Sequence, residues 1–121
     1  MGGLIQVFKI PIKVPSWNQI IGKNHWTIKR IKDEIKEETF VALKKQKIQK
    51  VVSYPVTLHF RALWKYNKPR DVDNICCKYV LDSMVENGVL RTDDTTSISQ
   101  VILEADIGCK EDVLFVRIIE P

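Results

Sequence analysis

Apolar and polar residues alternate in four short parts of the chain, and this period near two predicts β-strands. The first is residues 4–12. The second is residues 51–64, where Pro55 places the strand after it or at a sheet edge. The other two, residues 97–106 and 113–119, are separated by a turn-forming segment. Two neighbouring strands joined in this way are expected to form a hairpin.

Two longer parts of the chain have apolar residues at helical spacing. Residues 27–50 contain no Gly or Pro and interleave acids with lysines, as a solvated amphipathic helix does. Residues 74–86 repeat the apolar spacing, and Asn87 followed by Gly88 forms a helix stop. The element order is therefore β-α-β-α-β-β. It predicts a single α+β domain over residues 1–121, with two helices packed on one mixed sheet.

Composition is typical of a soluble globular protein. The chain has 121 residues, of which 45% are hydrophobic and 28% charged. No stretch is long and apolar enough to span a bilayer or to act as a secretory signal. We therefore expect a cytoplasmic protein without a membrane partner. The net charge of +4 and the pI of about 9.0 favour anionic partners such as nucleic acid.

The three cysteines predict buried free thiols in a reducing compartment. Cys76 and Cys77 lie within an apolar pattern, Cys109 is far from them in the sequence, and the two histidines are not at zinc-ligand spacing. His59 faces away from the apolar side of its strand, so we expect it to be a surface or cross-strand partner.

A basic and aromatic cluster that includes Lys23, His25 and Trp26 precedes the first expected helix. Such a cluster can contact a phosphate backbone or stack on a splayed base. The more ordinary expectation is that Trp17 and Trp26 are both buried in the core.

Carboxylates concentrate in residues 70–94. Asp71 and Asp73 precede the second expected helix, and Asp93 and Asp94 follow it. A hard cation such as Mg²⁺ prefers carboxylate oxygens, so acids that converge after folding predict a metal site. We expect Asp71 and Asp73 to share one side only where the backbone is extended. The competing explanation is that one of them caps the helix.

Cations accompany these acids. Lys65, Lys68 and Arg70 lie directly before the first two acids, an order suited to holding a phosphate against a metal ion. Exposed ion pairs within this loop are the alternative, and they would contribute little stability. Lys78 and Asp82, one helical turn apart, are either part of the site or a helix salt bridge.

In order and spacing, these residues resemble the RusA-type Holliday-junction resolvases, small endodeoxyribonucleases often carried by phages and prophages. The resemblance is carried by Arg70-Asp71-Val72-Asp73-Asn74, Lys78, Leu81-Asp82, Gly88-Val89 and Asp93-Asp94, with a weaker match in Pro15-Ser16-Trp17-Asn18. Lys78 follows Asn74 one residue later than the lysine of the family does, and the closing acids are also one residue later after the glycine.

The resemblance implies a bacterial homodimer that binds four-way DNA junctions and cuts two strands symmetrically with Mg²⁺ or Mn²⁺. It implies that Asp71, Asp73 and Asp94 are catalytic acids that bind the metal, and that Lys78 is a catalytic lysine. Residues with smaller parts are Arg70, which contacts DNA, and Asp82, Asn74 and Asp93, which support the site. Charge adds further candidates for phosphate contact, namely Lys23, Lys29, Arg30, Lys65 and Lys68.

Other functions remain open at this point. A non-catalytic DNA-binding module would use the acids only as helix caps, and a general nuclease would cut branched DNA without preferring four-way junctions. Calcium binding by a loop of the EF-hand kind is disfavoured, because Ile75 and Cys76 occupy positions that need an oxygen ligand and a glycine.

Overall fold

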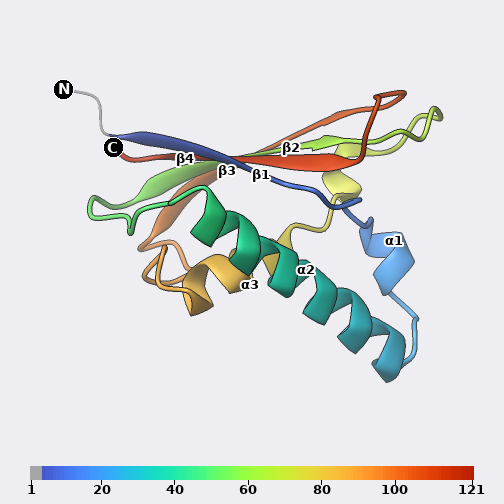
Figure 1. Cartoon of the computed structure of the whole chain (residues 1–121), viewed down its shortest axis with the longest axis horizontal. Coiled ribbons are helices and arrows are strands. Elements are labelled where there is room, and N and C mark those ends of the chain that lie inside the picture. The colour runs from blue at the N-terminus through green and yellow to red at the C-terminus, as the bar shows by residue number, and fades with distance from the viewer. Residues whose placement is uncertain (1–3) are drawn as a thin grey trace.

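Strand β2 (Val56–Leu63) lies between two partners in the sheet. It pairs in parallel with β3 (Ile98–Asp106) and antiparallel with β4 (Val113–Ile119), which pairs antiparallel with β1 (Ile5–Ile10). The computed structural model describes residues 4–121, and within them the sheet has four strands in the order β1-β4-β2-β3 (Figure 1).

Alternation along the strands divides the sheet into two faces. Leu58, Phe60 and Ala62 of β2, like Leu114 and Val116 of β4, are at most 1% exposed, because they point into the core. The residues between them face away from the helices. On this other face, cross-strand ion pairs join β2 to β3, in contrast to the apolar core side. They are His59 with Glu104 and Arg61 with Asp106.

His59 is therefore a cross-strand partner, as predicted. Its Nε2 atom is shielded from solvent and lies 2.7 Å from Oε1 of Glu104, without forming a directed hydrogen bond. The contact is an ion pair when the imidazole is protonated.

Helices cover the apolar face of the sheet, the face that carries Leu58 and Phe60 (Figure 1). The long helix α2 (His25–Lys45) begins where the Asn24 side chain accepts a hydrogen bond of 2.8 Å from the Thr27 N–H, and it ends with two lysines in its last turn. The shorter α3 (Lys78–Glu86) connects β2 to β3. No helix within residues 4–121 is both long and apolar enough to cross a membrane.

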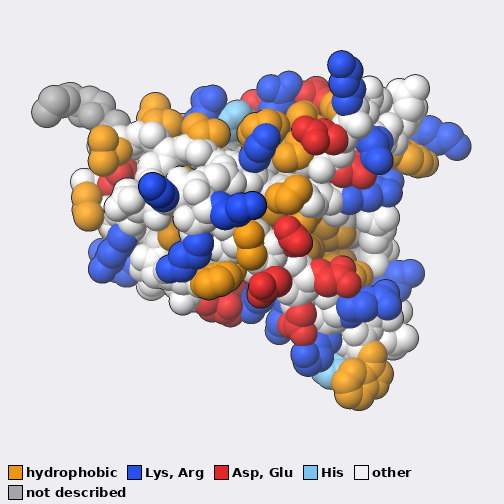
Figure 2. All heavy atoms as spheres, in the orientation of Figure 1, with side chains coloured by type: hydrophobic (Ala, Val, Ile, Leu, Met, Phe, Trp, Pro, Cys, Tyr) orange, Lys and Arg blue, Asp and Glu red, His pale blue; other side chains and the backbone are white. Residues whose placement is uncertain are grey.

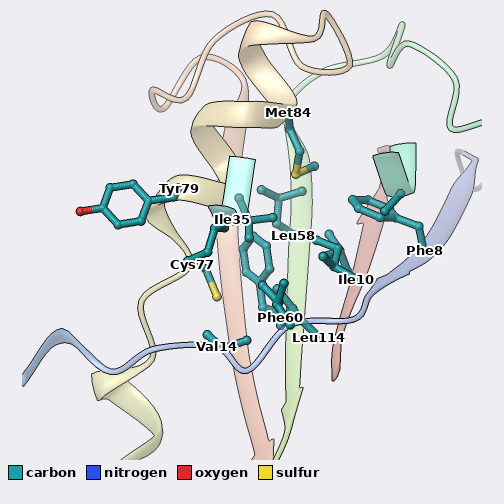
Figure 3. Packing of buried hydrophobic residues seen from close by; sticks show 14 of the residues in the cluster. Phe8, Ile10, Val14, Ile35, Leu58, Phe60, Cys77, Tyr79, Met84 and Leu114 are labelled. Carbon is teal, nitrogen blue, oxygen red and sulfur yellow. The ribbon is translucent and has the colours of Figure 1, made fainter. Parts of the chain in front are cut away.

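The core forms where α2 and α3 pack on the sheet. Figure 3 shows Ile35 of α2 and Met84 of α3 directed toward Leu58 and Phe60 of β2. Ile35 is 6% exposed and Met84 is completely buried. Such packing stabilises the fold by roughly 1.5–3 kcal/mol for each large apolar side chain that leaves water.

The α+β class and the single mixed sheet are confirmed, but three details of the prediction are wrong. The last two strands are not a hairpin, because β4 pairs with β1 and β2 while β3 lies at the sheet edge. The described residues contain two helical elements that were not predicted, the short helix α1 (Trp17–Ile20) before α2 and the 3₁₀ turn η1 (Val72–Asn74) before α3. The second expected helix begins at residue 78 rather than 74.

All three cysteines are free thiols, as expected. Cys76 and Cys77 are buried, and burial is the main cause that raises the pKa of each thiol above its usual value. Cys109 is half-buried.

Candidate active site

Two segments that are far apart in the sequence lie side by side near the N-terminal end of α3. Ser16 forms an isolated antiparallel bridge with Ile75, and the backbone N–H of Cys76 donates a hydrogen bond of 2.9 Å to the Pro15 carbonyl. These contacts join residues 15–18 to residues 70–74. The two segments that carry the resemblance to the resolvases therefore form one surface.

Each segment has a local reason for its shape. Ser16 caps α1, and its side chain and that of Gln19 form a capping box, with distances of 3.3 and 2.9 Å. Asp71 is extended, with φ −73° and ψ 126°, and its carbonyl accepts a hydrogen bond of 3.2 Å from the Asn74 N–H. The chain thus turns directly after Asp71.

A polar cavity of about 400 Å³ opens between these two segments. Amide, hydroxyl, guanidinium and carboxylate groups converge in it, a set that can bind phosphate and sugar oxygens. Its lining residues are Ser16, Asn18 and Gln19 on one side, and Pro69, Arg70, Asp71 and Asn74 on the other. We call it the Asp71 cavity.

The Arg70 side chain at this cavity is held by two aromatic rings. Its guanidinium carbon lies 4.3 Å from the centre of the Tyr66 ring and 5.1 Å from that of Trp64. Trp64 is 1% exposed, and its indole N–H donates a hydrogen bond of 3.1 Å to the Val14 carbonyl. The cation therefore stacks on a fixed platform, next to the candidate acid Asp71.

Asp73 was expected to share one side with Asp71 only if both residues lie in extended backbone, and they do not. Only Asp71 is in extended backbone, whereas Asp73 lies within the 3₁₀ turn η1 and does not line the cavity. Neither acid caps a helix with its side chain: Asp71 occupies the N-cap position of η1 without a side-chain hydrogen bond, and the N-cap residue of α3 is Cys77. The helix-cap explanation for these two acids is therefore wrong.

Lys78 and Asp82 form the salt bridge that their spacing allows. The Lys78 ammonium lies 3.5 Å from the Asp82 carboxylate, and the two side chains are 54% and 24% exposed. Lys78 is the first residue of α3, directly after the buried Cys76 and Cys77. A cation at this position is open to a ligand that reaches α3.

Asp94 lies at the opposite end of the β2–β3 pair from Asp71. Its carbonyl accepts hydrogen bonds from Ser97 and Ile98 at the start of β3, beside Val56 at the start of β2. Asp71 lies near the other end of β2, because Arg70 beside it stacks on Trp64, the residue that follows the strand. The two ends of this eight-residue strand are roughly 23 Å apart, at about 3.3 Å for each step between residues. Figure 1 shows this separation between the orange loop before β3 and the yellow η1 turn.

Local hydrogen bonds fix the Asp94 carboxylate. It accepts a bond from the Thr96 hydroxyl, one of 2.9 Å from the Thr96 N–H, and one of 3.0 Å from the Thr92 hydroxyl. These donors favour the ionised form and lower the pKa of Asp94. Asp93 beside it is exposed.

The acids do not form a ready metal site within one chain. Among residues 4–121, no three Asp, Glu, His or Cys side chains come together in a way that could hold a metal ion. Magnesium needs fewer protein ligands than this, since it is often bound through one or two carboxylates together with waters and substrate phosphate oxygens. In the Asp71 cavity, Asp71 offers one such carboxylate and the Asn74 amide lies at the same cavity.

The predicted DNA-contacting cations lie at the surface in two groups. Lys65 and Lys68 are exposed in the loop that leads to Arg70, and Lys23, Lys29 and Arg30 are exposed around the start of α2. Lys29 also forms an ion pair of 2.6 Å with Asp33.

The structure adds residues that the sequence did not single out. Gln19 lines the Asp71 cavity and Tyr66 stacks on Arg70. A capping-box pattern could have indicated Gln19, but nothing in the sequence indicated Tyr66. Of the two tryptophans expected in the core, Trp17 packs against it, whereas Trp26 is 76% exposed. The expectation for Trp26 was therefore wrong.

A larger hollow of about 520 Å³ lies between residues 11–15 and α2. Its charged lining residues are Lys13, Glu34 and Glu38, so acids outnumber cations there. The Asp71 cavity is smaller but brings together more of the groups that bind phosphate, and we place the candidate site there.

No protein-family model matches the sequence, and a comparison with curated proteins finds no significant match.

Proposed function

We propose that this protein is a metal-dependent endonuclease that cuts branched DNA, with the four-way junction as its main substrate. One observation carries the proposal. Residues 15–18 and 70–74, the two segments that resemble the resolvases, close around one cavity that contains Asp71 and the stacked cation Arg70. The net charge of +4 also favours DNA as the partner.

The residues around the cavity have distinct parts in this proposal. Arg70 binds a DNA phosphate, because its guanidinium is held in place and can donate two parallel hydrogen bonds. The amides of Asn18 and Asn74 orient the adjoining phosphate or sugar oxygens. Lys78 stabilises the negative charge that develops on the phosphate during hydrolysis.

The proposed metal ligands are Asp71 and Asp94, with Mg²⁺ or Mn²⁺ as the ion. Asp73, the third acid that the resemblance implies, lies in η1 outside the Asp71 cavity and is not among the ligands that the geometry favours. When bound, the ion supplies charge neutralisation and the activation of water for phosphodiester hydrolysis. Because Asp94 lies at the other end of the β2–β3 pair, it serves the same ion as Asp71 only if a second copy of the chain supplies it. The proposal therefore includes a homodimer, which also suits a junction with two-fold symmetry.

The experiment that tests this function compares two DNA substrates. Purified protein is incubated with a labelled four-way junction and with a linear duplex of the same sequence, with and without Mg²⁺. We expect cleavage of the junction only, and only with Mg²⁺. Equal cleavage of both substrates would indicate a general nuclease, and binding without cleavage would indicate a DNA-binding module.

Subunit mixing tests the shared site separately. Asp71→Asn and Asp94→Asn are each expected to be inactive alone. When the two variants are mixed and allowed to exchange subunits, a site with Asp71 from one copy and Asp94 from the other is complete, so junction nicking returns. If the mixture stays inactive while each variant still binds junctions, Asp94 is not supplied by a second copy.

A further inference from the structure

The start of α2 carries a hydrophobic tip that the core does not use. Trp26 is 76% exposed and Ile21, in the turn before it, is 69% exposed. Exposed apolar side chains are common on protein surfaces, and Leu4 and Val52 are similarly open here, but Trp26 is the largest of them. Figure 2 shows a hydrophobic side chain beside a histidine at the far end of the molecule, where α2 begins in Figure 1.

The Trp26 ring has an aromatic neighbour. The His25 ring packs against it edge to face, with centroids 5.4 Å apart and planes at 69°. The Asn24 side chain caps the helix by accepting a hydrogen bond from the Thr27 N–H, so both aromatic residues lie on regular helix rather than on a loose loop. The helix therefore fixes the backbone at Trp26, and the ring presents a flat apolar surface to solvent.

Charges around the tip favour an anionic partner. The first turn of α2 contains no acid, so the positive end of the helix dipole is not neutralised there. Lys23 and Arg30 are exposed close to Trp26 in the sequence. Exposed aromatic rings combined with nearby cations are the features with which proteins bind single-stranded or unstacked nucleic acid.

Helix α1 links the Asp71 cavity to the tip (Figure 1). Helix α1 contributes Asn18 and Gln19 to the cavity wall, and the chain runs from its end through the capped turn to Trp26. Helix α1 therefore lies between the two places at which we propose that DNA is bound.

We propose that Trp26, supported by His25, stacks on an unpaired base at the branch point of the DNA. This inference rests on the proposed function for its substrate, branched DNA. It goes beyond that function by assigning a base-stacking residue outside the acidic segment. The ring holds a splayed nucleotide while Lys23 and Arg30 contact its flanking phosphates.

Tryptophan fluorescence and affinity together test this assignment. A single-stranded oligonucleotide and a four-way junction are titrated in chelator into the wild-type protein and Trp26→Phe. We expect quenching in the wild type that is much smaller in the variant. Affinity should fall roughly five- to hundredfold in Trp26→Ala and much less in Trp26→Phe, which keeps a ring for stacking. Circular dichroism melting verifies that both variants fold.

The matched control is Phe115→Ala, which removes a partly exposed ring from the sheet face opposite the helices. It is expected to leave DNA affinity unchanged. Wild-type affinity in Trp26→Ala would overturn the inference even if junction cleavage is observed. A change in self-association without a change in DNA affinity would instead mark the tip as a protein contact. Loss of affinity in a protein that never cleaves would uphold the stacking role and remove the nuclease proposal.

Discussion

The guanidinium carbon of Arg70 lies 4.3 Å from the centre of the Tyr66 ring. This cation–π contact holds the arginine beside Asp71 at the cavity where we propose that a phosphate binds. Tyr66→Ala removes the ring, and an exposed contact of this kind contributes about 0.5–1 kcal/mol. We therefore expect junction affinity to fall roughly two- to fivefold, as measured by a binding titration in chelator.

Tyr66→Phe is the matched control, because it keeps the ring face and removes only the hydroxyl. Its affinity should equal that of the wild type. An equal loss in both variants would show that the hydroxyl, rather than the stacking of Arg70, matters for binding.

Lys78 and Asp82 allow a catalytic lysine to be separated from a helix salt bridge. Both Lys78→Met and Asp82→Asn remove the same pair, which contributes roughly 0.3–0.5 kcal/mol to the free energy of unfolding. Only Lys78→Met removes the cation, so we expect its kcat for junction cleavage to fall about a hundredfold or more. Similar cleavage rates in the two variants would contradict the catalytic role of Lys78.

The Asp94 carboxylate offers a test of local electrostatics. The Thr96 hydroxyl is the main cause of its lowered pKa, so Thr96→Val should raise this pKa toward the usual value for Asp, as measured by NMR titration. A lowered folded-state pKa stabilises the protein above the unfolded-state pKa of about 4, and this stability is lost as the pH falls through the folded value. The variant should therefore lose less stability on acidification. An unchanged Asp94 titration would exclude the hydroxyl as the cause.

The thiols should differ in reactivity according to their burial. Cys76 and Cys77 are 1% and 8% exposed with raised pKa values, whereas Cys109 is half-buried. A thiol reagent at neutral pH should therefore modify Cys109 first and the other two only after unfolding. Mass spectrometry of the modified peptides identifies the sites. Rapid modification of Cys77 in the folded protein would contradict its buried position.

Local patterns in the sequence predicted the elements well where neighbouring residues decide the structure. The alternation in residues 113–119 gave the bounds of β4 as observed, and the helical spacing gave most of α2. The order of the strands could not be read in the same way. Pairing of β4 with β1 and β2 depends on contacts between distant parts of the chain. The turn-forming segment between β3 and β4 suggested a hairpin and gave no sign that β2 lies between these two strands.

For the candidate site, too, the sequence predicted what depends on neighbouring residues and missed what depends on distant contacts. The sequence indicated Asp71, Arg70 and Asn74, which lie together, because they are close neighbours in the chain. It did not indicate that Asp94 lies at the other end of β2 and β3, since this depends on their parallel pairing. The exposure of Trp26 was also missed, because a tryptophan in a short connecting segment is usually at least partly buried.

Asp71 is the acid on which the proposed chemistry most depends. Replacing its carboxylate by an amide in Asp71→Asn keeps the size of the side chain and removes the charge that would bind the metal. Glu111→Gln makes the same change at an exposed acid in the loop between β3 and β4 and serves as the control.

The most direct measurement is the rate of four-way junction cleavage in Mg²⁺ by the wild type and these two variants, with junction binding in Ca²⁺ measured in parallel. The account predicts that Asp71→Asn binds the junction at least as tightly as the wild type but no longer cuts it, while Glu111→Gln retains both properties. Cleavage by Asp71→Asn at the wild-type rate, or no cleavage by the wild type, would contradict the account.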